Sequence, residues 1–520
     1  MASQAYHHNK KTGTTYVYSV HSYWDKEKKA PRNKQVCIGK LDKETGEIIP
    51  SRRKKTIAKR AALTPDVTAS ARVAGPSLLL NKLVEDTGLG KITKQCFPDL
   101  HEIIMSLVYF AVQKGLPLSR SEQWSIGHIH PAGEPIVSQR ISELLRKITE
   151  NDRQKFFAQW LRKMTESDYL CYDITSVSSY AIFNEYVKYG YNRDGESLPQ
   201  INVAMLFGQK SRLPAYYRRM QGNISDVATL RTTLKSLNFL GAKKMNFVLD
   251  RGFYSEANIN TLLDHRHNFT IAIPSGRKWV KAVIDRHYDS IESPQCYRQV
   301  DDSEALYVAT DLRKVGEKKR RGYLHIYYNA RRAADEFDRF TRRLLKYKQE
   351  VESGERVDKH EEHYARFLNI KTTPKRGMRV TFNDSEIQKH RNRYAGFFCI
   401  LSIKLKDPMD ALRVYRAKDV VEKSFDDLKN SLDMKRLRIH NSVAMDNRMF
   451  IQFLALILMC QIRNTIQSDR LLRNLSVREI METMETLVKI TYSGRYGQLY
   501  TELSPMQRKI IEVFELPPIS

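Results

Sequence analysis

The order of secondary-structure patterns between residues 169 and 273 constrains the fold more than any other feature of the sequence. The strand-like runs are Tyr169–Ser178, Ile201–Phe207, Pro214–Met220, Met245–Leu249 and Phe269–Ile273, and the helical segments are Ser225–Phe239 and Ser255–His265. Hairpin-linked strands pair antiparallel, whereas strands joined through a helix pair parallel. The order β-β-β-α-β-α-β therefore predicts an α/β fold, in which a mixed sheet carries helices on its faces.

The rest of the chain divides into regions of different composition around this core. A length of 520 residues suits roughly three domains. The sequence predicts a small β unit at 1–50, a basic linker at 51–77, a helical region at 78–165, the first part of the core at 166–274, an insertion with strands and a long helix at 275–407, the second part of the core at 408–470 and a helical region at 471–520. The helical region at 78–165 is interpreted either as DNA-binding or as purely structural.

The charge of the chain indicates a polyanionic partner. Lys and Arg number 87 against 59 Asp and Glu, which gives a net charge of +28. A membrane is the competing interpretation, but the longest apolar run, Met449–Ile462, is shorter than the roughly 20 residues of a membrane span. We therefore expect a buried helix there and no membrane partner. The N-terminus has no apolar signal core, and the six cysteines include no CxxC pair, so we expect a reduced protein in the cytoplasm.

Two aspartates lie where sheets of this kind place their chemistry. Asp173 lies within the first predicted strand, and Asp250 ends the fourth, before a turn that Gly252 permits. A carboxylate in an apolar strand costs several kcal/mol unless something neutralises it. Mg²⁺ would do so, since it binds one or two carboxylates together with substrate phosphate. Each aspartate taken alone is more typical of a turn or a helix cap.

A third acid lies on a late segment, Tyr415–Lys429, whose pattern predicts one continuous helix. On that helix Tyr415, Lys418, Glu422 and Lys429 share one narrow stripe, beside an apolar stripe that buries one flank. A carboxylate among groups that bind phosphate suits a metal ligand acting on a nucleic-acid backbone. The alternative is that Glu422 is an ion-pair partner on a basic helix.

The combination of these residues resembles a known family. The order Asp, Asp, Glu, with a long insertion before the helix of the Glu, resembles the DDE transposases of bacterial insertion sequences. More narrowly it resembles insertion-sequence family four, whose signature is Y-x2-R-x3-E-x6-K: Tyr415, Glu422 and Lys429 match, Lys418 replaces the Arg, and Arg416 stands two positions before Lys418. The segments GYNRDG (190–195), QGNISD (221–226) and VLDRGF (248–253) also match.

The resemblance implies an RNase H-like core and a mechanism. Asp173, Asp250 and Glu422 would hold two Mg²⁺ ions, for which Mn²⁺ can substitute, and DNA would be cut at the ends of the element and joined to target DNA. The side chains expected to bind DNA phosphates are Tyr415, Arg416, Lys418, Lys429 and Arg251. In such relatives a Trp of the insertion stacks on a flipped base, and Trp279 is the candidate here, although packing alone also explains a Trp at this position.

The resemblance also implies partners and a location. The partners would be double-stranded DNA, both the terminal inverted repeats and the target, and a second copy of the chain in a homodimer or larger assembly. The expected location is the bacterial cytoplasm, at the nucleoid. Two alternatives are a metal-dependent nuclease that cuts without joining strands and a non-catalytic, sequence-specific DNA-binding protein.

Overall fold

The computed structural model describes residues 3–25, 30–50, 68–164, 169–181, 183–241, 244–374, 377–390, 393–493 and 497–519. They divide into two compact units, one containing Met1–Arg72 and Val488–Thr501 and the other containing Val73–Leu487 and Glu502–Ile519. Of the linker expected at 51–77, residues 51–67 lie outside the described residues. Its last part differs from the expectation, because it contains a strand, β5 (Ala69–Val73), and the start of helix α2 (Gly75–Asp86).

The first unit is built from antiparallel strands. Strands β1 (Ser3–Asn9), β2 (Thr14–Asp25), β3 (Ala30–Leu41) and β4 (Ile48–Pro50) pair in sequence order. Gly13 closes the β1–β2 turn with a φ of 63°, a left-handed conformation that glycine adopts at little cost. Strands β18 (Val488–Tyr492) and β19 (Gln498–Tyr500) pair antiparallel, so the predicted C-terminal region is not wholly helical.

The second unit is organised around one large mixed sheet. The strands are β6 (Tyr169–Ser179), β7 (Gln200–Gly208), β8 (Pro214–Gln221), β9 (Asn246–Leu249), β10 (Asn268–Ile273), β11 (Tyr297–Gln299), β12 (Ala305–Val315), β13 (Arg320–Tyr328) and β16 (Phe397–Ser402). Their order is β11-β12-β13-β16-β10-β9-β6-β7-β8. Strands β6, β9 and β10 are parallel, and β6, β7 and β8 are antiparallel. The predicted mixed sheet is thus confirmed.

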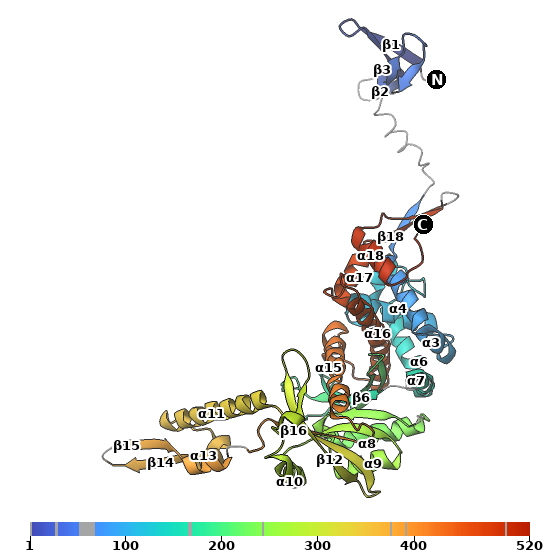
Figure 1. The fold of residues 1–520 in the computed structure, drawn as a ribbon. Helices are drawn as coiled ribbons and strands as arrows, with labels where there is room; N and C mark the ends of the chain where they lie inside the picture. Colours follow the sequence, from blue (N-terminus) through green and yellow to red (C-terminus); the bar gives the residue numbers. More distant parts are fainter. Residues whose placement is uncertain are drawn as a thin grey trace. The chain divides into compact units, whose positions relative to one another are not determined.

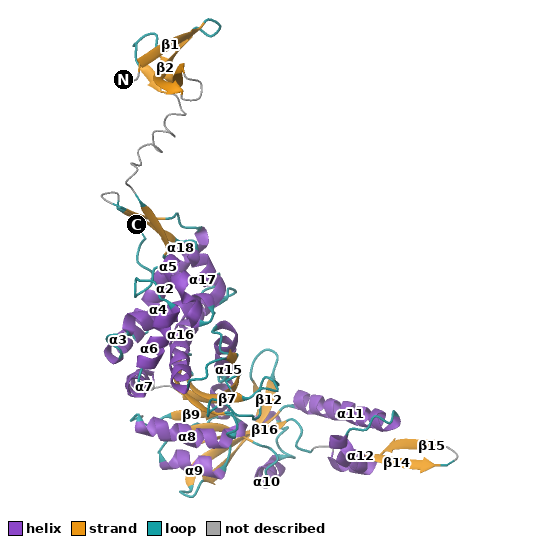
Figure 2. Ribbon diagram, turned by 180° about the vertical axis from the view of Figure 1, so that it is seen from behind, coloured by secondary structure: helices purple, strands orange, loops and turns teal. Residues whose placement is uncertain are grey.

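Helices cover both faces of this sheet. Helices α8 (Asp226–Phe239) and α9 (Glu256–Asp264) lie on one side, whereas α15 (Asp419–Asp426) and α16 (Ser442–Ser468) lie on the other (Figures 1 and 2). The order from β6 through α8, β9 and α9 to β10 is the order read from the sequence. This agreement follows from apolar periodicity, because strands of period 2 and helices of period 3.6 each bury one face.

The region expected as a separate insertion, 275–407, contributes four strands to the sheet. Strand β16 pairs antiparallel with both β10 and β13, and β11, β12 and β13 extend the sheet beyond it. The reason is that β10 would otherwise expose unpaired backbone groups along one edge. The sheet therefore includes four strands that the sequence pattern placed outside it.

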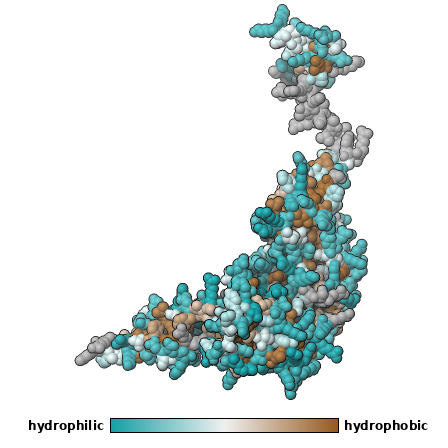
Figure 3. Space-filling view, viewed as in Figure 1, coloured by the Kyte–Doolittle hydropathy of each residue, from teal (hydrophilic) through white to brown (hydrophobic). Residues whose placement is uncertain are grey.

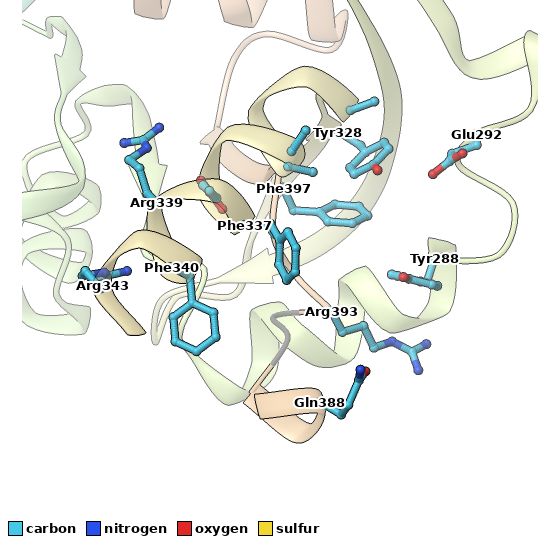
Figure 4. Close-up of a pocket in the computed structure, with 15 residues that line it drawn as sticks. Tyr288, Glu292, Tyr328, Phe337, Arg339, Phe340, Arg343, Gln388, Arg393 and Phe397 are labelled. Carbon is cyan, nitrogen blue, oxygen red and sulfur yellow. The ribbon is translucent and has the colours of Figure 1, made fainter. Parts of the chain in front are cut away.

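What remains of the insertion is an arm between residues 329 and 396. It consists of α11 (Ala330–Glu352), α12 (Glu361–Phe367), β14 (Leu368–Thr373), β15 (Gly377–Phe382) and α13 (Asp384–His390). The arm has its own apolar core, which includes Leu344, Tyr364 and Val380. At its base, beside α10 (Lys278–His287), lies a cavity of about 820 Å³ lined by aromatic side chains such as Phe337 and Phe397 (Figure 4).

Helix α16 forms the centre of the helical part of this unit. It contacts α4 (His101–Lys114) and α6 (Ser138–Lys147) on one side and β8 on the other. The other helices there are α3 (Leu89–Cys96), α5 (Ser121–Gly127), α7 (Glu150–Met164), α17 (Val477–Glu485) and α18 (Pro505–Val513). By length and composition α16 could cross a membrane, but 78% of its most apolar stretch is buried inside the protein, whereas most of the surface in Figure 3 is hydrophilic. A buried helix was expected at Met449–Ile462, and α16 fills that role.

Candidate active site

Asp173, on β6, and Asp250, directly after the neighbouring strand β9, lie beside each other. Strands β6 and β9 pair in parallel register, with Tyr172 opposite Leu249, so the two aspartates occupy the next position on each chain. Tyr172 points toward α8, where its hydroxyl lies 3.2 Å from the hydroxyl of Thr233. Because side chains alternate along a strand, Asp173 projects from the opposite face, which α14 (Pro408–Arg416) and α15 cover. The structure thus brings together the two aspartates predicted from the sequence.

The two carboxyl groups have different pKa values despite their proximity. Burial raises the pKa of Asp173 to about 6, against the opposing effect of the Ile174 backbone N–H, which donates to its Oδ1 at 2.8 Å. Burial alone would also raise the pKa of Asp250. There the Tyr415 hydroxyl and the Lys418 ammonium outweigh burial and hold the pKa below its ordinary value. Near neutral pH, both groups are ionised, and Asp173 is the one that accepts a proton on mild acidification.

Two groups from the late segment bind Asp250 directly. The Tyr415 hydroxyl, at the end of α14, donates a hydrogen bond to Asp250 Oδ1 at 2.6 Å. The Lys418 ammonium lies 3.1 Å from the same oxygen. These side chains were predicted to bind phosphate. In this structure Tyr415 donates a hydrogen bond to Asp250 and Lys418 neutralises its charge, at the position where phosphate chemistry was expected.

The single helix predicted for Tyr415–Lys429 is wrong. Helix α14 ends at Arg416, α15 runs from Asp419 to Asp426, and a π-helical turn, η5 (Asp427–Ser431), follows. The Lys418 N–H donates to the Tyr415 carbonyl at 3.3 Å, a tight i to i+3 bond that interrupts the α-helical ladder. The break lets both Tyr415 and Lys418 reach one oxygen of Asp250, which outweighs the propensity for a continuous helix.

Glu422 does not join the two aspartates. It is exposed on α15 and lines a shallow pocket with Lys423, Asp426, Asp427 and Arg463. Among the described residues no three His, Cys, Asp or Glu side chains lie close enough together to hold a metal ion. Because the helix is interrupted before α15, side chains on α15 point in other directions than they would on one continuous helix. Glu422 therefore does not lie beside Asp250, as the predicted stripe required.

Lys429 and Arg416 are already paired with carboxylates. Lys429 is almost buried in the π-helical turn, and its ammonium lies 2.7 Å from both oxygens of Asp194. The Arg416 guanidinium forms a bidentate pair with Glu304, at 2.6 and 2.8 Å. Neither cation is therefore available to a DNA phosphate in this structure, in contrast to the prediction from the sequence.

Arg251 and Trp279 differ in their accessibility. Arg251 begins the short 3-10 helix η2 (Arg251–Phe253) directly after Asp250 and is exposed. Trp279, on α10, is partly buried: the Arg313 guanidinium lies 3.8 Å from its ring centroid, and the Tyr254 ring lies 6.4 Å away. Trp279 is thus a packing residue in this structure, and its stacking on a base stays a prediction.

A polar bridge beside Asp173 was not predicted from the sequence. The Arg193 guanidinium pairs with Asp226 at 2.6 Å, and its backbone N–H donates to the Ser176 hydroxyl at 3.1 Å. Asp194, the next residue, holds Lys429. The loop therefore joins β6, the start of α8 and the π-helical turn. Its only signal in the sequence was that GYNRDG and QGNISD match the family, which identifies the segments without their contacts.

Comparison with known proteins identifies the region that contains these residues. The family model described as "Transposase DDE domain" matches residues 165–458. Curated proteins yield no match. Among solved structures, the chain is similar to the cryo-EM structure of the piggyBac transposase synaptic complex with hairpin DNA, at 10% identity, over 79% of this chain and 77% of that one, with a TM-score of 0.38. That likeness is too distant to bear on the fold.

Proposed function

Because the chain belongs to the transposase DDE domain family, we propose that it is a transposase that cuts DNA at the ends of a mobile element and joins those ends to target DNA. Within the family, the spacing of Tyr415, Glu422 and Lys429 supports a place in insertion-sequence family four. The transposase acts on paired DNA ends as a homodimer or larger assembly, in the bacterial cytoplasm at the nucleoid. The charge of +28 supports the DNA partner.

The observation that carries the proposal is the adjacency of Asp173 and Asp250. Two carboxylates on neighbouring parallel strands, one of them with a pKa raised by burial, fit a divalent cation, because cation binding would offset the cost of ionising Asp173. Asp173 and Asp250 would hold Mg²⁺ or Mn²⁺. When bound, such ions supply activation of the attacking oxygen and stabilisation of the leaving oxygen in phosphodiester chemistry.

The protein's own side chains then have separate tasks. Tyr415 fixes the orientation of Asp250 through its 2.6 Å hydrogen bond. Lys418, which pairs with Asp250 in this structure, would be available to a phosphate oxygen if Asp250 held a cation instead. Arg251, exposed beside Asp250, holds a phosphate of the same strand.

Glu422 takes part only after a rearrangement. The break at Ala417–Lys418 lies between Tyr415, which is tied to Asp250, and α15, which carries Glu422. A change in the backbone at this break would reorient α15 while Tyr415 stays in place. The third carboxylate is thus a feature of the DNA-bound state, assembled when Lys418 leaves Asp250.

The test is a product analysis with duplex DNA that carries the inverted repeats flanking the coding region. Wild-type protein with Mg²⁺ should yield both cut ends and products in which a donor 3′ end is joined to a target plasmid. Asp173→Asn and Asp250→Asn should yield neither, whereas the exposed control Asp302→Asn should match wild type. Cut ends without joined products would identify the nuclease alternative, and binding with no cutting under any metal would identify a DNA-binding protein.

A further inference from the structure

A cationic cavity lies near the end of β6, apart from Asp173 and Asp250. It is a cavity of about 680 Å³ between η1 (Leu118–Arg120) and the segment 433–439, which leads from the π-helical turn toward α16. Five cations line it, and the charged residues of its lining are Arg120, Lys435, Arg436, Arg438, Arg448 and Asp433. A concave site with five cations and one carboxylate suits an anionic ligand.

Two of the five cations are neutralised within the protein. Arg448 donates to the Asp433 carboxylate at 2.6 Å and to its carbonyl at 2.9 Å, and Arg436 pairs with Glu196 at 2.8 Å. Arg120, Lys435 and Arg438 are exposed and form no ion pair within 4 Å in the part of the chain that the structure describes. The cavity therefore keeps a local excess of three positive charges.

One cation of the lining is a largely buried arginine with an unsatisfied donor. Arg448 is only 9% exposed, and its Nε has no hydrogen-bond partner in the described structure. A buried guanidinium N–H without an acceptor costs free energy. Arg448 belongs to the lining of this cavity, so the positive charge of its guanidinium adds to the local cationic potential.

The backbone ties the cavity to the strand that carries Asp173. Asp433 adopts a φ of 55°, a left-handed conformation that its side-chain and carbonyl bonds to Arg448 hold in place. Strand β17 (Arg436–Leu437) then pairs parallel with β6, with Arg436 opposite Ser178. Ser178 is five residues beyond Asp173, which is about 17 Å along a strand. That length equals about five base pairs of B-form DNA.

We propose that this cavity binds backbone phosphates of the DNA duplex about five base pairs from Asp173 and Asp250. The identity of the polyanion rests on the proposed function, whereas the cation cluster and its orphaned donor do not. Arginine forks suit phosphate oxygens geometrically, and the volume exceeds that of one phosphate, so the site takes consecutive phosphates of one strand. The cavity would hold the duplex in register while the cut is made at the aspartates.

The test measures DNA binding without cutting. Full-length wild type and the double variant Lys435→Ala/Arg438→Ala are titrated against a fluorescein-labelled 30-base-pair duplex of arbitrary sequence, in EDTA, over a series of NaCl concentrations. We expect the double variant to bind roughly tenfold more weakly near 0.1 M NaCl and its slope of log K against log [NaCl] to fall by about two, one for each lost phosphate contact. Both side chains are exposed, so the unfolding midpoint should stay at the wild-type value.

The matched control removes one Arg and one Lys from the arm, and thus the same number of positive charges. Arg342→Ala/Lys359→Ala, both exposed and outside the cavity, should leave affinity and slope at wild-type values. Unchanged binding by Lys435→Ala/Arg438→Ala, or an equal loss in the control, would overturn the proposal. This experiment measures binding and not cutting. A negative result therefore does not contradict the proposed reaction, and a negative result of the cleavage test does not contradict DNA binding by the cavity.

Discussion

The two regions that form the candidate site follow from the sequence in different ways. Asp173 and Asp250 lie on neighbouring strands, and the register of β6 with β9 alone makes them neighbours. The segment from Tyr415 to Lys429 must instead reach the sheet from a distant part of the chain, and it does so as two helices and a π-helical turn. The position of a residue within a strand follows from the local alternation of apolar and polar residues. The direction in which a side chain of the Tyr415–Lys429 segment points depends instead on the contacts that interrupt its helix.

The contrast shows that a stripe on a helical wheel is a weaker prediction than a pair of strand positions. Tyr415 and Lys418 are next to Asp250, as the stripe suggests, but Glu422, only four residues later, is exposed on α15. The helix is interrupted between α14 and α15, and the predicted stripe fails for Glu422, which lies after this interruption. The two central strands therefore position both aspartates, whereas the helical segment brings only Tyr415 and Lys418 to Asp250.

The largest expected effect is on the rate of DNA cleavage, and it compares a residue of the sheet, Asp250, with a residue of the helical segment, Tyr415. Asp250→Asn should lower the rate of DNA cleavage about a thousandfold or more, because it removes a cation ligand at the reacting centre. Tyr415→Phe should lower it roughly tenfold, because it removes one hydrogen bond to a charged group that keeps its other contacts. Initial rates on duplex DNA carrying the terminal repeats measure both. Equal losses would show that Tyr415 is as essential to cutting as Asp250.

The second prediction concerns the pH dependence of stability. The pKa of Asp173 is raised by burial to about 6, so between pH 4 and 6 the folded protein holds this proton and the unfolded chain releases it. The contribution of Asp173 to the free energy of unfolding therefore falls as pH rises through this range, by about 2 to 3 kcal/mol. Asp173→Asn should match wild type near pH 4 and exceed its stability by that amount at pH 8.

Urea unfolding at each pH measures this difference. Asp302→Asn, an exposed control, should follow wild type throughout. A constant gap between Asp173→Asn and wild type from pH 4 to pH 8 would mean that Asp173 titrates as an ordinary exposed aspartate, and that its strand position carries no electrostatic cost.

The third prediction concerns the pair that anchors the π-helical turn. Lys429→Met leaves the partly buried Asp194 without its cation and should lower the free energy of unfolding by about 1 to 2 kcal/mol. The double variant Lys429→Met/Asp194→Asn should recover most of the loss, and a double-mutant cycle in urea measures the coupling. Single variants with wild-type stability but weakened DNA binding would instead restore Lys429 to the phosphate-binding role predicted from the sequence.

The smallest expected effects concern Arg416 and Arg251, which were both predicted from the sequence to bind DNA phosphates. Arg416→Ala should leave DNA affinity unchanged and lower stability by at most about 1 kcal/mol, because its guanidinium pairs with Glu304 near the surface. Arg251→Ala should weaken binding and lower the salt slope by about one, because Arg251 is exposed beside Asp250. The salt series described for Lys435 and Arg438 also serves here, and the opposite pattern would reverse the two assignments.

The pattern of the sequence determined the order of strands and helices from β6 to β10, the burial of α16, and the positions of Asp173 within a strand and of Asp250 directly after one, because each depends on local periodicity. It also identified the transposase family through the spacing of a few residues. Only the tertiary structure decided that β16 pairs with β10, that Lys429 pairs with Asp194, and that α14 and α15 are separate helices. The reason is that these features join residues more than a hundred positions apart, or exist because such contacts outweigh local helix propensity, and local periodicity contains no information about them.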